Sequence, residues 1–513
     1  MDRKHDHSVK NSIGRLIFVA VSLLIQIGWM LLLIFEFNQS SAWISTLTNM
    51  IAILIVLEII SKHNNAAFRL PWVIVILAFP PVGLVLYLLT GRSTITKHKQ
   101  KQFARIGNEL RSRLETGTSA LADADAQSLT LANQMRYIRN DSGYPAYTNT
   151  EVQFYGDTCC ALDALAEALS QAQSFIFMEY HAIEDAKAFG RIRKILSERA
   201  AQGVEVRIIY DDVGSVGFIS PEFIKRMKKD GIQCRVFNPL LPVINVFMNN
   251  RDHRKITVID GRIGFTGGYN LADEYFNIVQ PYGEWKDTGL RLEGQAVRNL
   301  TVQFLEMWNT IRESDRDFTR YFPDIPSDLH KSGYVQPYGD SPLDDIYLGE
   351  NVYMNMVKSA ERYIWFTTPY LIIDDEMSRE LTLAAKRGVD VRILTPGIPD
   401  KKLIFQLTRS YYHQLVSSGV RIYEFSPGFL HAKQCVCDDR TAVVGTINLD
   451  YRSLYFHFEN AVFFAECDAV LDVKKDFEQT LPRCCEVTEQ YREELRGLKR
   501  LKIQILRLFA PLL

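Results

Sequence analysis

The 513-residue chain has almost no net charge and no recognisable cysteine framework. Its 59 lysines and arginines nearly balance 60 aspartates and glutamates, for a formal charge of −1, which gives no reason to expect a polyelectrolyte partner such as nucleic acid. The eight cysteines include no Cys-x-x-Cys pair, and their spacing fits neither a zinc knuckle nor a disulfide framework. No Ser/His/Asp triad or metal-binding carboxylate cluster stands out. We therefore expect reduced thiols, no metal and no cofactor.

One short motif occurs twice. The first copy reads His253-Arg-Lys255-Ile-Thr-Val-Ile-Asp260, and the second reads His431-Ala-Lys433-Gln-Cys-Val-Cys-Asp438. In each copy a glycine follows 14 residues after the His and an asparagine follows 17 residues after it, namely Gly267 with Asn270 and Gly445 with Asn448. A single copy could be a solvated basic strand, but two full copies with matching turns indicate a function.

The spacing of this motif suits an anionic phosphoryl group. In an extended strand the side chains at positions i and i+2 point to the same face, so each His lies beside its Lys. The ammonium neutralises negative charge, and the imidazole attacks phosphorus or moves a proton. The Gly-x-x-Asn turn lets the backbone approach closely and adds an amide donor. We therefore predict a catalytic set of His253, Lys255, His431 and Lys433, with phosphate-binding Asn270 and Asn448.

The paired motif resembles the phospholipase D superfamily and, within it, the bacterial cardiolipin synthases. The resemblance runs from about Leu70 to the C-terminus. Besides the two motifs it rests on Thr367-Thr-Pro-Tyr370, Trp285-Lys-Asp287-Thr, Asn448-Leu-Asp450-Tyr-Arg452-Ser453 and the terminal Arg507-Leu-Phe-Ala-Pro-Leu-Leu513. It implies a membrane-bound transphosphatidylase that joins two phosphatidylglycerol molecules into cardiolipin and releases glycerol. Phosphatidylglycerol and anionic membrane lipid are thus the expected partners, and the oligomeric state stays open.

Apolar strand patterns also repeat along the chain. The segments 174–181, 203–210 and 231–237 are matched by 362–370, 388–394 and 419–425, and helical stretches separate the segments. This alternation predicts an α/β fold with helices flanking mixed sheets, in two pseudo-symmetric repeats that share one active site. The expected divisions are membrane segments over 1–91, a basic helical linker over 92–150, repeats over 151–330 and 331–485, and a basic amphipathic tail over 486–513.

The first expected division holds three apolar runs, 16–35, 44–60 and 72–89. A run of about 20 apolar residues is long enough to cross a bilayer. Lys62 and Arg69 lie between the second and third runs, whereas the first connection carries no basic residue, which places the N-terminus and the second connection inside. The third run has Pro80-Pro81 at its middle. It either crosses the membrane or turns back at these prolines to the side from which it entered. The favoured topology is a multi-pass cell-membrane protein with a cytoplasmic catalytic domain.

Roles within the motif follow partly from chemistry and partly from the resemblance. Family members usually take the nucleophile from the N-terminal motif, which implies a phosphatidyl-histidine at His253 and a proton-transferring His431; the reverse assignment stays open. Asp260 and Asp438 complete the family's motif, yet they begin turns at strand ends and are interpreted as structural. Acidic residues on the strand after each motif, Asp287 and Glu459, are better candidates for orienting the histidines. Asp287 could instead pair with Lys286.

Other residues carry weaker signals. His181 is a candidate for the cleft wall, and Tyr180 and Tyr370 line either the substrate path or the core, whereas His413 and His457 are as readily structural. The C-terminal segment 491–513 alternates basic and apolar residues, so it forms a helix that either lies on an anionic membrane or packs on the catalytic domain. Rival functions are a hydrolytic phospholipase D, a phosphatidylserine synthase, a nuclease of the superfamily, and a non-enzymatic membrane scaffold, which would not need both motifs.

Overall fold

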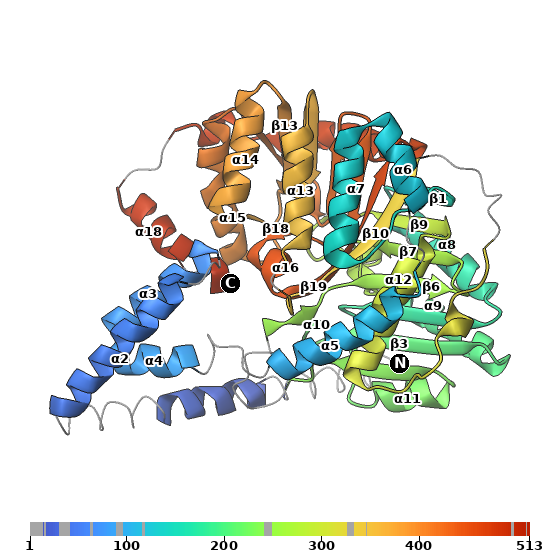
Figure 1. The fold of residues 1–513 in the computed structure, drawn as a ribbon, viewed down its shortest axis with the longest axis horizontal. Coiled ribbons are helices and arrows are strands. Elements are labelled where there is room, and N and C mark those ends of the chain that lie inside the picture. The colour runs from blue at the N-terminus through green and yellow to red at the C-terminus, as the bar shows by residue number, and fades with distance from the viewer. Residues whose placement is uncertain are drawn as a thin grey trace.

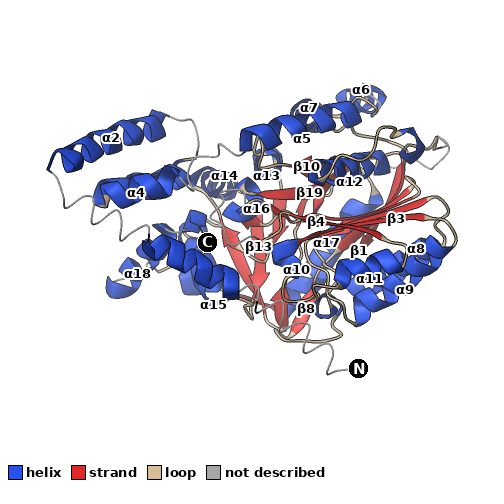
Figure 2. Ribbon diagram, turned by 90° about the horizontal axis from the view of Figure 1, so that it is seen from below, coloured by secondary structure: helices blue, strands red, loops and turns tan. Residues whose placement is uncertain are grey.

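The computed structural model describes residues 14, 17–29, 42–61, 65–88, 96–114, 118–240, 249–325, 333–344, 346–493, 497–508 and 510–512. Two mixed β-sheets form its centre, and helices surround them (Figures 1 and 2). The first sheet has the strand order β1-β9-β7-β6-β2-β3-β4. Its strands are β1 (Thr150–Tyr155), β2 (Phe175–Tyr180), β3 (Glu205–Asp211), β4 (Gln233–Phe237), β6 (Lys255–Ile259), β7 (Ile263–Gly267) and β9 (Gly289–Gly294).

The second sheet repeats this order and adds two strands, one at its edge and one that pairs with β19 outside this order. It runs β10-β19-β17-β16-β11-β13-β14-β20, so every strand of the first sheet has an equivalent at the same position. Its strands are β10 (Tyr334–Asp340), β11 (Tyr363–Thr367), β13 (Asp390–Pro396), β14 (Arg421–Phe425), β16 (Gln434–Cys437), β17 (Thr441–Gly445), β19 (His457–Ala465) and β20 (Cys484–Glu486). The predicted α/β class with two pseudo-symmetric repeats is confirmed.

Helices connect the strands and cover the sheets. In the first repeat they are α8 (Thr158–Ser170), α9 (Lys187–Ala201), α10 (Asp212–Ser215), α11 (Phe223–Lys229) and α12 (Val297–Ile311). In the second repeat they are α13 (Leu348–Ser359), α14 (Asp375–Lys386), α15 (Lys402–Val416), α16 (Tyr451–Tyr455) and α17 (Asp468–Thr480). Several begin at an aspartate that accepts a hydrogen bond from a backbone N–H of the first turn, as Asp157 does for α8 and Asp374 for α14.

One apolar core runs through both repeats. It joins Leu290 and Phe304 of the first repeat to Val335 and Val443 of the second. Strands such as β2 are buried along their whole length. Continuous burial explains why their sequences read as apolar runs rather than as alternating patterns. The two repeats therefore form a single body, which holds the motif strands of both repeats in fixed positions.

The N-terminal helices project from this body (Figure 1) and touch it at Phe68, whose ring packs against those of Tyr451, Tyr455 and Phe456. Among the described residues, one helix is long and apolar enough to cross a membrane, within α2 (Ala42–Ser61). Only 17–29 of the first expected run is described, as a shorter apolar helix. The third run is broken into α3 (Ala66–Ala78) and α4 (Pro80–Leu86), and neither part has the length of a span.

Helix α4 folds back onto α3 at the prolines. A Cβ atom at Gly83 would lie 2.6 Å from the Cα of Ile76, so only glycine allows this close approach. Ile76, Leu84 and Tyr87 then share a small apolar cluster with Val56 of α2. The result is a compact helical hairpin. The sequence left open whether the third run continues or turns back at Pro80-Pro81, and in the structure it turns back.

The structure changes the interpretation of the two regions next to the repeats. The stretch expected to be a linker forms α5 (Thr96–Arg111), α6 (Thr118–Gln127) and α7 (Leu129–Ser142), whose apolar side chains join the catalytic core. The tail helix α18 (Gly497–Leu508) packs on α15 and α3. The Arg507 guanidinium lies 4.2 Å from the centre of the Tyr411 ring, whereas Leu501 and Ile505 remain exposed. The tail helix thus packs on the protein through one part of its surface and leaves Leu501 and Ile505 exposed. Packing on the protein and contact with a membrane therefore both stay open as roles of the tail.

Candidate active site

The two motifs meet because two short strands cross between the repeats. Strand β5 (Arg251–Asp252) leads into the first motif and pairs in parallel with the start of β19 in the second repeat. Strand β15 (Gly428–Leu430) leads into the second motif and pairs in parallel with β8 (Glu284–Lys286) of the first repeat. The backbone N–H of His253 donates to the carbonyl of Phe458 at 2.9 Å, and that of His431 donates to the carbonyl of Lys286 at 2.7 Å.

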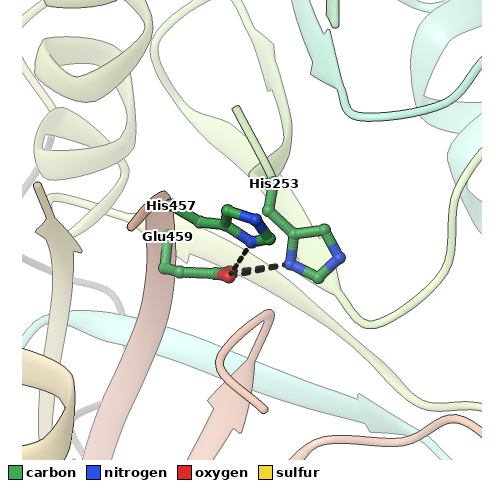
Figure 3. Close-up of side chains that lie close together, drawn as sticks. All are labelled: His253, His457 and Glu459. Carbon is green, nitrogen blue, oxygen red and sulfur yellow. Dashed lines mark hydrogen bonds and ion pairs between the residues drawn. The ribbon is translucent and has the colours of Figure 1, made fainter. Parts of the chain in front are cut away.

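Each motif histidine is held by a carboxylate of the opposite repeat. The Nδ1 atom of His253 lies 2.9 and 3.0 Å from the two carboxylate oxygens of Glu459 (Figure 3), and Nδ1 of His431 lies 2.6 Å from Oδ2 of Asp287. An Nδ1–H that donates to a carboxylate leaves Nε2 free as the reactive nitrogen. The sequence named both carboxylates as orienting residues without assigning either to a histidine, and the topology pairs each with the motif of the opposite repeat.

The motif lysines lie directly behind the histidines and are 1% exposed. The Nζ atom of Lys255 donates to the carbonyl of His253 at 2.6 Å. The Nζ atom of Lys433 donates to the carbonyl of His431 and lies 2.8 Å from Nδ1 of the same residue. Burial lowers the pKa of Lys255 to about 8 and that of Lys433 to about 7. Both charges therefore depend on pH near neutrality.

Burial also keeps the imidazoles neutral. Together with the charge of Lys255 and the neighbouring imidazoles, it holds the pKa of His253 well below its ordinary value. Burial and the charge of Lys433 lower the pKa of His431 to about 4, although Asp287 opposes the shift. Burial alone would raise the pKa of Asp287, but His431 and Lys433 hold it below its ordinary value. At neutral pH the site thus offers two uncharged imidazoles, each next to a carboxylate.

Both asparagines predicted to bind phosphate reach the same cleft as the histidines. The Oδ1 atom of Asn270 accepts from the backbone N–H of Ala182 at 3.1 Å, and its Nδ2 donates to the Tyr275 hydroxyl at 2.8 Å. The Nδ2 atom of Asn448 donates to Oδ2 of Asp450 at 2.9 Å, whereas its Oδ1 is buried without a hydrogen-bond partner. Each amide keeps one further N–H for a ligand, so phosphate binding remains a prediction for both.

The motif aspartates do not line this cleft. The carboxylate of Asp260 accepts from the backbone N–H groups of residues 173–175, at 2.7 to 2.8 Å. The carboxylate of Asp438 accepts from those of residues 361–363, at 2.7 to 2.9 Å. Both aspartates adopt a left-handed backbone with φ of 53°, which suits the turns that they begin. In each repeat the aspartate thus anchors the start of the strand next to the motif strand.

The cleft has a volume of about 540 Å³ and two different walls. Around His253 the rings are imidazoles, with centres 5.1 Å away for His181 and 5.4 Å away for His457. Around His431 they are Trp285 at 5.1 Å, Tyr275 at 5.3 Å and Phe429 at 5.8 Å. Charged groups at the cleft include Arg251, Glu274, Asp400, Lys401, Asp450 and Arg452.

The weaker sequence signals divide between cleft and core. His181, Tyr370 and His457 line the cleft. Tyr180 does not, because it is buried in the first repeat, where its hydroxyl lies 2.9 Å from that of Thr257. His413 lies on α15, and its Nδ1 is 3.0 Å from the Tyr491 carbonyl. His457 lies two residues before Glu459 on the same strand. In the sequence, this spacing was the signal that the two side chains point to the same face.

One group of the described residues has the composition of a metal site. The donor atoms of His253, His457 and Glu459 all lie within 4.8 Å of one another (Figure 3). Two histidines and a glutamate are a known set of zinc ligands. Here, however, the carboxylate already bonds to His253 and to the Thr446 hydroxyl, and the positive charges of Lys255 and Lys433 act on the same imidazole. These charges favour an anion over a divalent cation.

The chain resembles proteins that act on phospholipids. A family profile described as "Cardiolipin synthase, PLD-like domain" matches residues 165–308 and 353–481, and one described as "Phospholipase_D-nuclease N-terminal" matches residues 50–92. An uncharacterized protein of Streptococcus mutans is 39% identical, with 89% of this chain and 99% of that protein aligned. A cardiolipin synthase of Halalkalibacterium halodurans is 32% identical, with 91% and 93% aligned.

A solved structure shares the fold. The phosphatidylserine synthase of Haemophilus influenzae matches 74% of this chain and 97% of its own, with a TM-score of 0.55 and 14% sequence identity. At that identity the likeness concerns the fold alone. The two-repeat arrangement is therefore found in another protein of divergent sequence.

Proposed function

Because the chain belongs to the phospholipase D-like family of cardiolipin synthases, we propose that it transfers a phosphatidyl group from one phosphatidylglycerol to another. The products are cardiolipin and glycerol. The observation that carries the proposal is the pair of crossed histidine–carboxylate contacts, His253 with Glu459 and His431 with Asp287, on one cleft. Two neutral, oriented imidazoles at one cavity suit a two-step exchange at phosphorus.

In the first step, Nε2 of His253 attacks the phosphorus of a phosphatidylglycerol. The new P–N bond replaces the P–O bond to the headgroup glycerol, and His431 gives a proton to that departing oxygen. With a pKa of about 4, His431 is neutral in the free enzyme. The negative charge of the bound phosphodiester favours the imidazolium, so His431 takes up a proton from solvent as the substrate binds.

In the second step, the headgroup hydroxyl of another phosphatidylglycerol takes the place of glycerol. His431, now neutral, removes the hydroxyl proton as the oxygen attacks phosphorus. The P–N bond breaks, and His253 is released as the free imidazole. Glu459 stabilises the positive charge that His253 carries in the intermediate, because its carboxylate stays on Nδ1 throughout.

Lysine and amide groups take the place of a metal in this scheme. The ammonium groups of Lys255 and Lys433 offset the charge of the phosphoryl oxygens, and spare N–H groups of Asn270 and Asn448 add hydrogen bonds. We therefore propose that the reaction needs no metal ion.

The enzyme would act at the cell membrane, anchored by its N-terminal helices. The apolar α2 is followed by Lys62 and Arg69, which favours the cytoplasm for this end. The α3–α4 hairpin returns the chain to the side from which it entered, so the catalytic body lies on the cytoplasmic face. A reporter fused after Thr96 would then be active inside the cell, and activity only outside would contradict this topology.

The decisive experiment gives labelled phosphatidylglycerol to the purified protein in detergent with excess chelator. Wild type should form cardiolipin and glycerol, whereas His253→Ala should form neither. His413→Ala is the matched control, because that histidine lies away from the cleft. Release of phosphatidic acid would identify a hydrolase, and loss of turnover on chelation would contradict the metal-free scheme.

A further inference from the structure

His457 is a nearly buried histidine at the reaction centre whose ring nitrogens have no hydrogen-bond partner. It is the first residue of β19 and lines the cleft, and its side chain is 10% exposed. Its Nδ1 lies 3.5 Å from Oε1 of Glu459 (Figure 3), beyond good hydrogen-bond distance. The Glu459 carboxylate is already engaged, by Nδ1 of His253 and by the Thr446 hydroxyl.

An unsatisfied imidazole in this position needs an explanation. Burying a polar group without a partner costs free energy, so such groups are uncommon unless a ligand completes them. The other cleft histidines each have Nδ1 engaged: His181 by the Asp252 carbonyl at 2.8 Å, and the two motif histidines by their carboxylates. Of these four histidines, His457 is the one whose two nitrogens both lack a hydrogen bond.

The pseudo-symmetry places an aromatic ring at the same position of both repeats. The residue two positions before the orienting carboxylate is His457 in the second repeat and Trp285 in the first. Trp285 packs against His431 just as His457 packs against His253, with ring centres 5.1 and 5.4 Å apart. A ring therefore meets the packing requirement in both repeats. The buried Nε1 of Trp285 also lacks a hydrogen-bond partner, but only the imidazole of His457 places its nitrogens beside Glu459 and His253.

The charges around this donor favour an oxyanion as its ligand. Lys255 and Lys433 both act on the adjacent imidazole of His253, whereas Arg251 on the same wall is paired with Asp211. A phosphodiester held for attack by His253 brings two unesterified oxygens to this position. A neutral imidazole has one N–H to donate, and a hydrogen bond to a charged acceptor is about twice as strong as a neutral one.

We propose that His457 is a phosphate-binding residue, which donates a hydrogen bond to an unesterified phosphoryl oxygen of the lipid that His253 attacks. This inference rests on the proposed phosphatidyl transfer. In this role His457 holds the phosphorus next to Nε2 of His253 in both steps. It thereby distinguishes the His253 half of the cleft from the aromatic half around His431.

The test compares His457→Phe, which keeps a ring but removes the N–H, with His457→Gln, which keeps an amide donor. The matched control is His413→Phe on α15. We expect His457→Phe to lower kcat/KM for phosphatidylglycerol about 10- to 100-fold, the loss typical of a hydrogen bond to a charged group. His457→Gln should recover much of this loss, and His413→Phe should resemble wild type. Thermal unfolding of each variant checks that the fold is retained.

Binding of inorganic phosphate gives a readout independent of lipid turnover. Calorimetry and competitive inhibition should both show phosphate binding about 10- to 100-fold weaker in His457→Phe than in wild type. Equal losses in folded Phe and Gln variants would overturn the proposal, since shape rather than the donor would then matter. Wild-type values in His457→Phe would overturn it as well.

The lipid kinetics and the phosphate-binding measurement together separate the inference about His457 from the proposed function. If wild type turns over phosphatidylglycerol but His457→Phe is unaffected in both measurements, the inference fails alone. If wild type turns over no phosphatidylglycerol and the phosphate dissociation constant still rises in His457→Phe, the anion site stands and the proposed reaction fails. Weaker phosphate binding without any change in lipid kinetics would restrict His457 to free phosphate and overturn its role toward the lipid.

Discussion

The two halves of the cleft share a backbone and differ in what surrounds the reacting histidine. His253 lies between the imidazoles of His181 and His457, whereas His431 lies among Tyr275, Trp285 and Phe429. The fold thus repeats the machinery that orients a histidine, while the residues around it diverged. In the proposed reaction the imidazoles of the first half can donate to a phosphoryl oxygen, whereas the second half surrounds its histidine with larger aromatic rings. The asymmetry supports the assignment of His253 as nucleophile.

The largest loss of activity is expected when either motif histidine is replaced. We expect His253→Ala and His431→Ala each to lower turnover by at least about 10⁴-fold, as for essential members of other catalytic sets. The two variants should differ after an acid quench with phosphatidylglycerol labelled in the phosphatidyl group. His431→Ala should retain protein-bound label, because the adduct is not resolved, and His253→Ala should retain none. Label on His253→Ala but not on His431→Ala would reverse the assignment.

The crossed carboxylates come next in expected effect. Glu459→Gln and Asp287→Asn remove the charge behind His253 and His431, and each should lower kcat about 10²- to 10⁴-fold, as when the orienting aspartate of a hydrolase triad is lost. Glu459→Gln should slow formation of the labelled adduct, and Asp287→Asn should slow its resolution, as rapid-quench kinetics would show. The opposite pattern would mean that each carboxylate serves the motif of its own repeat.

The pH dependence of the reaction tests the motif lysines, of which each half of the cleft has one. Lys433, with a pKa of about 7, and Lys255, with a pKa of about 8, lose their positive charge as pH rises. Because the ammonium form of each lysine stabilises the phosphoryl oxygens, kcat/KM should be high below pH 7, fall about tenfold per unit between pH 7 and 8, and fall about a hundredfold per unit above pH 8. Lys433→Arg keeps its charge, so its alkaline limb should move toward that of Lys255. An unchanged limb in this variant would exclude Lys433 as the titrating group.

The motif aspartates should show the smallest effect on catalysis. Asp260→Ala and Asp438→Ala each leave three backbone N–H groups without their acceptor, two of them on residues at or near the surface. We expect each to lower the free energy of unfolding by about 1–3 kcal/mol with little change in kcat at low temperature. Thermal unfolding and kcat measured on the same preparation check this. A large loss of kcat in a fully folded variant would give the aspartates a catalytic role.

Much of this molecule could be predicted from the sequence because its signals are local. The paired motifs, their turns and the repeated strand patterns depend on spacing within a few tens of residues, and these gave the α/β class and the two repeats. The turn-forming character of Asp260 and Asp438 is also local, since each begins a turn at the end of its own strand.

Contacts between the repeats depended on the tertiary structure. The crossed pairs join residues 206 and 144 positions apart, and pairing of β5 with β19 and of β15 with β8 brings them together. Strand patterns do not encode which repeat a side chain will face, so the sequence named both carboxylates but not the histidine that each one orients. For the same reason Tyr180 and His181, which are neighbours in the chain, divide between core and cleft.

The sequence by itself determined the candidate reacting groups, because two histidines and two lysines recur at a fixed spacing on strands. Only the tertiary structure decided which carboxylate serves which histidine, which pKa values burial shifts, and which rings line each half of the cleft. These properties arise from packing one repeat against the other. They depend on distance and on the exclusion of water, neither of which is a property of any single segment of the chain.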